Sequence, residues 1–232
     1  MKAPAATFAL VGSLVAALAV TATASARTVL LGRSWQGRPI RALEVGNRSG
    51  TPVLVVGCIH GNETGGIPVA RALARLSPSD LNLWIVPDLN PDGVAAGTRL
   101  NAHGVDLNRN FPRRWRRLGG VYESGPRPLS EREARIARAL ILRVRPHVTI
   151  WFHQHLDLVW ASGGNRRIER VFARVSGLSY RPLPQLPGSA VTWQNAALLG
   201  TTAFAAELPA GQPGPATVAR YVRAVLAAAR VR

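Results

Sequence analysis

The chain has 232 residues, with 29 lysines and arginines against 12 aspartates and glutamates, which gives a formal net charge of +17 at neutral pH. A single cysteine excludes an internal disulfide, so a hydrophobic core must hold the fold, with or without a metal. The charge favours anionic partners such as a cell envelope, unless it only reflects a coding bias toward arginine. Nucleic acid is not expected, because the arginines are scattered and no nucleic-acid-binding module is recognisable.

The first 26 residues have the pattern of a signal peptide, with Lys2, an apolar stretch over residues 8–20, and small residues at Ala24 and Ala26. This pattern predicts cleavage after Ala26 and a secreted or cell-envelope location, periplasmic or extracellular. The stretch is shorter than the roughly 20 residues that cross a bilayer, so an uncleaved anchor is the less favoured alternative. No later segment is apolar enough to span a membrane, and residues 27–232 suit one domain.

Apolar runs alternate with amphipathic segments in the rest of the chain. The expected strands are residues 28–32 and 39–46, which form an opening hairpin, then 52–59, 83–87, 148–152 and 201–206. The expected helices end near Leu76 and Arg145 and cover residues 165–175 and 216–229, and Ser130 with Glu133 predicts a capping box before the second of them. This alternation predicts an α/β fold whose sheet is buried on both faces.

Sites in such sheets gather beyond the carboxyl ends of the strands. Three segments with suitable side chains follow expected strands: His60-Gly61-Asn62-Glu63, His153-Gln154-His155 and Glu207-Leu208-Pro209. Two histidines and a carboxylate form a common catalytic zinc set, and Glu207 is then available as a base. His153 and His155 are two residues apart and would share one side of a strand, so spacing does not choose between them.

Between these segments lies a polar stretch that contains Asn90-Pro91-Asp92-Gly93 and residues 98–112. Turn propensity alone would make it a surface loop. However, carboxylate, amide and guanidinium groups are concentrated in residues 106–110, and a guanidinium matches a carboxylate through two parallel hydrogen bonds. Substrate recognition is therefore the competing interpretation.

Taken in order, these motifs resemble the zinc carboxypeptidase family, and most of all its short murein peptide amidase branch. The resemblance runs from about Gly57 to Pro209, and its most specific part is Gly-Val-Asp-Leu-Asn-Arg-Asn-Phe-Pro at residues 104–112. It implies a single α/β domain with a mixed, mostly parallel twisted sheet and helices on both faces. It also implies one zinc ion per chain.

The resemblance assigns roles residue by residue. It implies zinc ligands at His60, Glu63 and His153, a general base at Glu207, a carboxylate behind the first histidine at Asp106, substrate-carboxylate binding by Asn108 and Arg109, and carbonyl polarisation by Arg99. His155 would then line the pocket or be exposed. The family's mobile tyrosine has no clear counterpart, because Tyr180 lies several residues too early relative to residues 187–189.

The expected activity is hydrolysis of the amide between γ-D-glutamate and meso-diaminopimelate in peptidoglycan-derived peptides. A conventional metallocarboxypeptidase acting on ordinary peptides is the closest alternative. A non-catalytic, cationic envelope-binding protein is an alternative of a different class. Glu207 separates them, since a binding protein has no need of a carboxylate beside a complete metal set.

Overall fold

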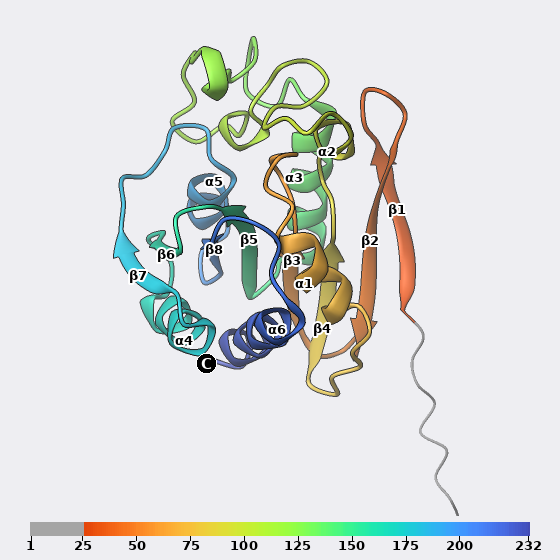
Figure 1. Cartoon of the computed structure of the whole chain (residues 1–232), viewed down its shortest axis with the longest axis vertical. Coiled ribbons are helices and arrows are strands. Elements are labelled where there is room, and N and C mark those ends of the chain that lie inside the picture. The colour runs from red at the N-terminus through yellow and green to blue at the C-terminus, as the bar shows by residue number, and fades with distance from the viewer. Residues whose placement is uncertain (1–25) are drawn as a thin grey trace, which may run out of the picture.

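The structure, a computed structural model, describes residues 26–232, so the predicted signal peptide lies outside it apart from its last residue. Eight strands form one mixed sheet in the order β1-β2-β4-β3-β5-β8-β6-β7 (Figure 1). The strands are β1 (Arg27–Arg33), β2 (Pro39–Gly46), β3 (Thr51–Val56), β4 (Leu81–Val86), β5 (Val148–Gln154), β6 (Leu158–Ala161), β7 (Ser179–Pro182) and β8 (Thr202–Leu208). The helices are α1 (Gly66–Leu73), α2 (Pro91–Ala96), α3 (Arg132–Val144), α4 (Arg166–Ser176), α5 (Ala190–Ala197) and α6 (Pro215–Ala229), with short 3₁₀ turns η1 (Leu107–Arg109) and η2 (Gly120–Tyr122).

The centre of the sheet, β4-β3-β5-β8, is parallel and buried on both faces. Side chains alternate between two cores along β3: Val53 and Val55 pack on the face covered by α1, α4 and α6, while Leu54 and Val56 pack on the face covered by α3 and α5. The predicted single-domain α/β fold with helices on both faces is therefore confirmed. No helix within residues 26–232 is long and apolar enough to cross a membrane.

The structure also corrects the predicted elements. The ladder of β3 ends at Val56, three residues before the predicted end, because the paired stretches of β4 and β5 end there too. The capping box is wrong: Glu131 is the N-cap of α3, and the Ser130 hydroxyl donates to the Glu131 carboxylate and accepts from Asn110 instead. The prediction missed β6, β7, α2 and α5, which are at most eight residues long.

One buried carboxylate organises the loop that leads from α2 into η1. Glu131 Oε2 accepts hydrogen bonds from Trp35 Nε1 at 3.0 Å and from Asn101 Nδ2 at 2.8 Å. The Asn101 side-chain oxygen in turn accepts from the backbone N–H groups of His103 and Val105. The first hairpin, this loop and the start of α3 are thereby joined.

Candidate active site

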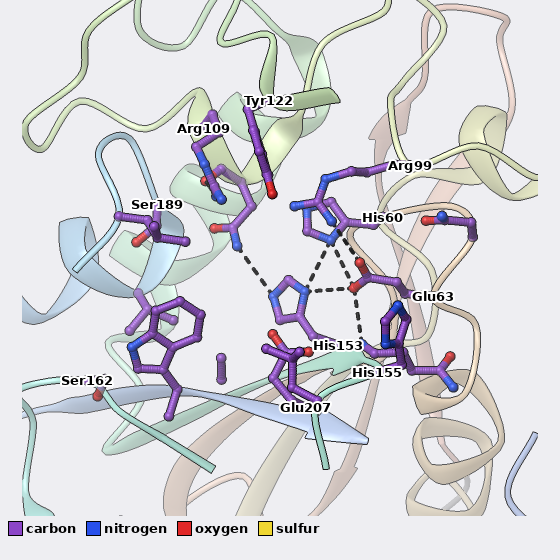
Figure 2. A pocket seen from close by; sticks show the side chains of 18 of the residues that line it. His60, Glu63, Arg99, Arg109, Tyr122, His153, His155, Ser162, Ser189 and Glu207 are labelled. Carbon is purple, nitrogen blue, oxygen red and sulfur yellow. Dashed lines mark hydrogen bonds and ion pairs between the residues drawn. The ribbon is translucent and has the colours of Figure 1, made fainter. Parts of the chain in front are cut away.

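Two histidines and a glutamate meet at the carboxyl ends of β3 and β5. Nδ1 of His60 and Nδ1 of His153 each lie 2.9 Å from Oε2 of Glu63, and the two nitrogens lie 3.2 Å from each other. All three side chains are buried. Figure 2 shows this group at the centre of the site, with Arg99 beside it and Glu207 below it. The structure therefore brings together the three predicted ligands.

The turn after β3 brings His60 and Glu63 together. The backbone N–H of Glu63 donates to the carbonyl of His60 at 2.9 Å, which turns both side chains to one side. A side chain at Gly61 has no room, since a Cβ there would lie 1.9 Å from the carbonyl carbon of Gly93. Gly61 thus permits α2 to lie close against the turn after β3.

Asp106 connects the first histidine to an arginine. Its Oδ1 lies 2.9 Å from Nε2 of His60, and its Oδ2 accepts from Nη2 of Arg99 at 2.9 Å. Nη1 of Arg99 donates to Oε1 of Glu63 at 2.8 Å. Burial alone would raise the pKa of Asp106, but the contact with His60 and the charges of Arg99 and Arg109 outweigh it and hold that pKa well below its usual range. Asp106 is therefore a carboxylate that orients the His60 ring.

The register of β8 against β5 places Glu207 in the site. Glu207 is the ladder partner of His153 on the neighbouring parallel strand, so both side chains project from the same face. Its Oε2 is buried without a hydrogen-bond partner among the described residues. Burial raises the pKa of Glu207, and the negative charge of Glu63 adds to this, while His153 opposes it. A carboxyl group with a free oxygen in this position can exchange protons with a molecule in the cavity.

The residues fit a zinc ion. Two imidazole nitrogens and one carboxylate oxygen are the donor set of many catalytic zinc sites. Zinc holds such donors at about 2.0–2.1 Å in a tetrahedron, which places them roughly 3.3 Å apart, close to the 2.9–3.2 Å separations found here. Asp106 at Nε2 of His60 leaves Nδ1 as the nitrogen that faces the group.

Asn108 and Arg109, predicted to bind a substrate carboxylate, lie on η1 at the wall of the same cavity. Asn108 Oδ1 accepts from the backbone N–H of Ala190 at 2.9 Å, while Nδ2 lies 3.4 Å from Nε2 of His153. Nη1 of Arg109 donates to the carbonyl of Asn108 at 2.8 Å, and burial lowers the pKa of Arg109. The second N–H of the Asn108 amide and the rest of the guanidinium group are thus available to a ligand.

These groups line a cavity of about 820 Å³, large enough for a short peptide. Its other walls come from the rim segment 116–122, the end of β5, residues 185–192 and the residues after β8. His155 lies beyond the end of β5, lines this cavity and is exposed. It is not part of the His60–Glu63–His153 group.

Tyr122 lines the cavity, whereas Tyr180 lies elsewhere. Tyr180 does not line the cavity; its hydroxyl donates to Glu169 at 2.7 Å beside α4. Tyr122, which the sequence reasoning missed, lines the cavity with half of its surface exposed, and its ring lies against the guanidinium groups of Arg99 and Arg109. No local signal singled out Tyr122, because its place beside the arginines depends on the fold of residues 110–124.

Comparison with known proteins decides the family. The sequence model described as zinc carboxypeptidase matches residues 13–167. The chain belongs to the zinc carboxypeptidase family. The matched family segment includes His60, Glu63 and His153, whereas Glu207 lies beyond it and joins them through the pairing of β8 with β5.

One related sequence and two solved structures illustrate the similarity to known proteins. Murein peptide amidase A of Escherichia coli (strain K12) is 34% identical over 143 residues, which cover 55% of this chain and 59% of that protein. The crystal structure of murein-tripeptide amidase MpaA from Escherichia coli O157 has a TM-score of 0.70 at 27% identity and covers 88% of this chain and 92% of that one. Carboxypeptidase A from Helicoverpa armigera, with a TM-score of 0.75 at 19% identity over 88% of this chain and 68% of that one, shares the fold.

Proposed function

We propose that this protein is a zinc-dependent amidase that cleaves peptidoglycan-derived peptides between γ-D-glutamate and meso-diaminopimelate. The observation that carries the proposal is the position of Glu207, whose free carboxyl oxygen is buried beside the His60–Glu63–His153 group in a peptide-sized cavity. Similarity to murein peptide amidase A supports the choice of substrate.

A bound zinc ion supplies Lewis acidity, which polarises a carbonyl group and lowers the pKa of a water molecule. His60, Glu63 and His153 would hold that ion. Glu207 accepts a proton from the attacking water and then delivers it to the leaving nitrogen, a general acid–base role. Arg99, held in place by Asp106 and Glu63, stabilises the negative charge that develops on the carbonyl oxygen.

Asn108 and Arg109 bind the carboxylate next to the scissile amide on the amine side. Arg109 is 4% exposed and has no carboxylate within 4.0 Å among residues 26–232, so a substrate carboxylate is a suitable partner for its buried charge. Export by a signal peptide cleaved after Ala26, and attraction of the basic chain to an anionic cell envelope, are parts of the same proposal.

The test is hydrolysis of the tripeptide L-alanyl-γ-D-glutamyl-meso-diaminopimelate, followed by product analysis. We expect release of free meso-diaminopimelate, loss of activity with a chelator and recovery with zinc, while Glu207→Gln serves as the inactive control. Removal of C-terminal residues from ordinary L-peptides, with the tripeptide left intact, would instead indicate a conventional carboxypeptidase. Binding to envelope material with no turnover of either substrate would indicate a non-catalytic protein.

A further inference from the structure

The cavity holds more unpaired positive charge than the proposed reaction requires. Three arginines line it: Arg99, Arg109 and Arg116. Arg99 is paired with Glu63 and Asp106, but Arg109 and Arg116 have no carboxylate within 4.0 Å in the part of the chain that the structure describes. The carboxylates of the lining are Glu63, which contacts both histidines, and Glu207, the proposed base. Arg116 therefore faces the cavity without a carboxylate partner among the described residues.

The backbone at Arg116 is held in place although its side chain is exposed. The buried hydroxyl of Ser124 donates to the carbonyl of Arg116 at 3.0 Å and accepts from the backbone N–H of Leu118 at 3.0 Å. The neighbouring Trp115 donates from Nε1 to the carbonyl of Ser124 at 3.2 Å. These three bonds fix where the Arg116 side chain leaves the rim, which is a requirement for selective recognition.

Backbone contacts place this rim on the side of the cavity that holds Asn108 and Arg109. The N–H of Phe111 donates to the carbonyl of Gly188 at 2.9 Å, and the N–H of Gly188 donates to the carbonyl of Arg113 at 3.0 Å. The segment that leads to Arg116 therefore runs beside residues 187–189, next to Ala190, the partner of Asn108. Arg116 and Arg109 therefore border the same side of the cavity.

We propose that Arg116 binds a second carboxylate on the amine-side residue of the substrate, so that this residue is a diaminodicarboxylate. The inference rests on the proposed amidase function, and it assigns the side-chain carboxylate of meso-diaminopimelate to Arg116. A lysine in the same place has no such carboxylate. A guanidinium group forms two parallel hydrogen bonds with a carboxylate, and such charge-assisted bonds are worth about 1.5–3 kcal/mol, or roughly 10- to 150-fold in kcat/KM or Kd.

The experiment compares four peptides: γ-D-glutamyl-meso-diaminopimelate, the same peptide with the side-chain carboxylate amidated, γ-D-glutamyl-lysine, and a peptide amidated at the α-carboxylate of the glutamate. The enzymes are wild type, Arg116→Gln and the matched control Arg117→Gln, whose exposed arginine is adjacent in sequence but does not line the cavity. We expect wild type and Arg117→Gln to lose at least 10-fold in kcat/KM on side-chain amidation or lysine substitution. Arg116→Gln should lose less than threefold, with unchanged zinc content.

Amidation of the glutamate α-carboxylate should affect wild type and Arg116→Gln by the same factor. If Arg116→Gln instead abolishes the effect of that amidation, the second carboxylate lies on the acyl side and our assignment is wrong. If Arg116→Gln and Arg117→Gln lower kcat/KM for γ-D-glutamyl-meso-diaminopimelate by the same factor relative to wild type, the effect is one of net charge. That result would also overturn the proposal.

A binding measurement separates this inference from the proposed function. Calorimetry with free meso-diaminopimelate and free lysine, on zinc-loaded wild type and Arg116→Gln, does not depend on turnover. If no peptide is cleaved but wild type still binds meso-diaminopimelate at least 10-fold more tightly than lysine, and Arg116→Gln does not, then the amidase proposal fails and the carboxylate site stands. Equal affinity of wild type for the two amino acids would reject the site.

Discussion

Oδ1 of Asp106 lies 2.9 Å from Nε2 of His60, 46 positions away in the chain. Because this carboxylate is buried and holds one ring nitrogen, the other nitrogen, Nδ1, is the one that faces Glu63 and His153. Asp106 therefore decides how the first imidazole is presented to a metal.

We expect Asp106→Asn to bind zinc about 10- to 100-fold more weakly than wild type, because an amide cannot hold the imidazole as a carboxylate does. Competition with a chelator of known affinity measures this change. Asp80→Asn is the matched control, since Asp80 forms an exposed ion pair with Arg230 on another part of the chain. Equal zinc affinity of Asp106→Asn and wild type would contradict the prediction.

Glu207→Gln should keep its zinc and lower kcat by about 10²- to 10⁴-fold, since the amide cannot accept a proton from water. Glutamine has nearly the same shape, so the buried contacts around β8 are preserved. Metal analysis and turnover are measured on the same preparation. Activity within threefold of wild type would exclude Glu207 as the general base.

Arg109→Lys retains the positive charge but loses the planar group that pairs with a carboxylate. It should lower kcat/KM about 10-fold or more without changing zinc content. Conversion of the α-carboxylate beside the scissile amide to a neutral amide should lower kcat/KM strongly for wild type and little for Arg109→Ala. The reason is that the mutation and the substrate change remove the same interaction. Strictly additive losses would mean that Arg109 only supports the loop.

Asp88 gives a prediction for stability against pH. Burial, with a smaller contribution from the charge of Asp92, raises the pKa of Asp88 to about 6. A carboxyl group with a raised folded-state pKa stabilises the fold at a pH below about 4, and this contribution is lost as the pH rises through about 6. Above that pH the partly buried charge destabilises the native state.

Asp88→Asn should therefore raise the free energy of unfolding at pH 8 by on the order of 2–3 kcal/mol and change it little at pH 4. The side-chain oxygen that accepts from the backbone N–H of Asn90 is retained in this variant. Urea unfolding at the two pH values measures the difference, and Asp80→Asn should show no gain at pH 8. A gain of equal size at both pH values would point to packing instead of charge.

Much of the sheet could be predicted from local pattern, whereas the roles of the site residues came from the resemblance to the zinc carboxypeptidase family. Apolar runs gave the central strands, because strands buried on both faces have few polar residues. The prediction was weakest for short elements: β6 and β7 have four residues each, and their strand conformation depends on pairing with the rest of the sheet. The capping box failed for the same reason, since contacts with Asn110 and Glu131 determine where the Ser130 side chain points.

His60 and Glu63 lie on one short turn, so a local motif was enough to pair them. Spacing did not separate His153 from His155, and the family resemblance chose His153. The structure adds a physical reason, because β5 ends at Gln154 and the regular alternation of side chains does not extend to His155. The approach of Glu207 to His153 needed the register of β8 against β5, and the bond from Asn101 to Glu131 needed the packing of α3. The sequence determined which chemical groups are present and which of them share a turn, because these depend on residues close together in the chain. Only the tertiary structure decided which distant groups share a cavity and which charges remain unpaired, as at Arg116, because long-range packing sets those distances.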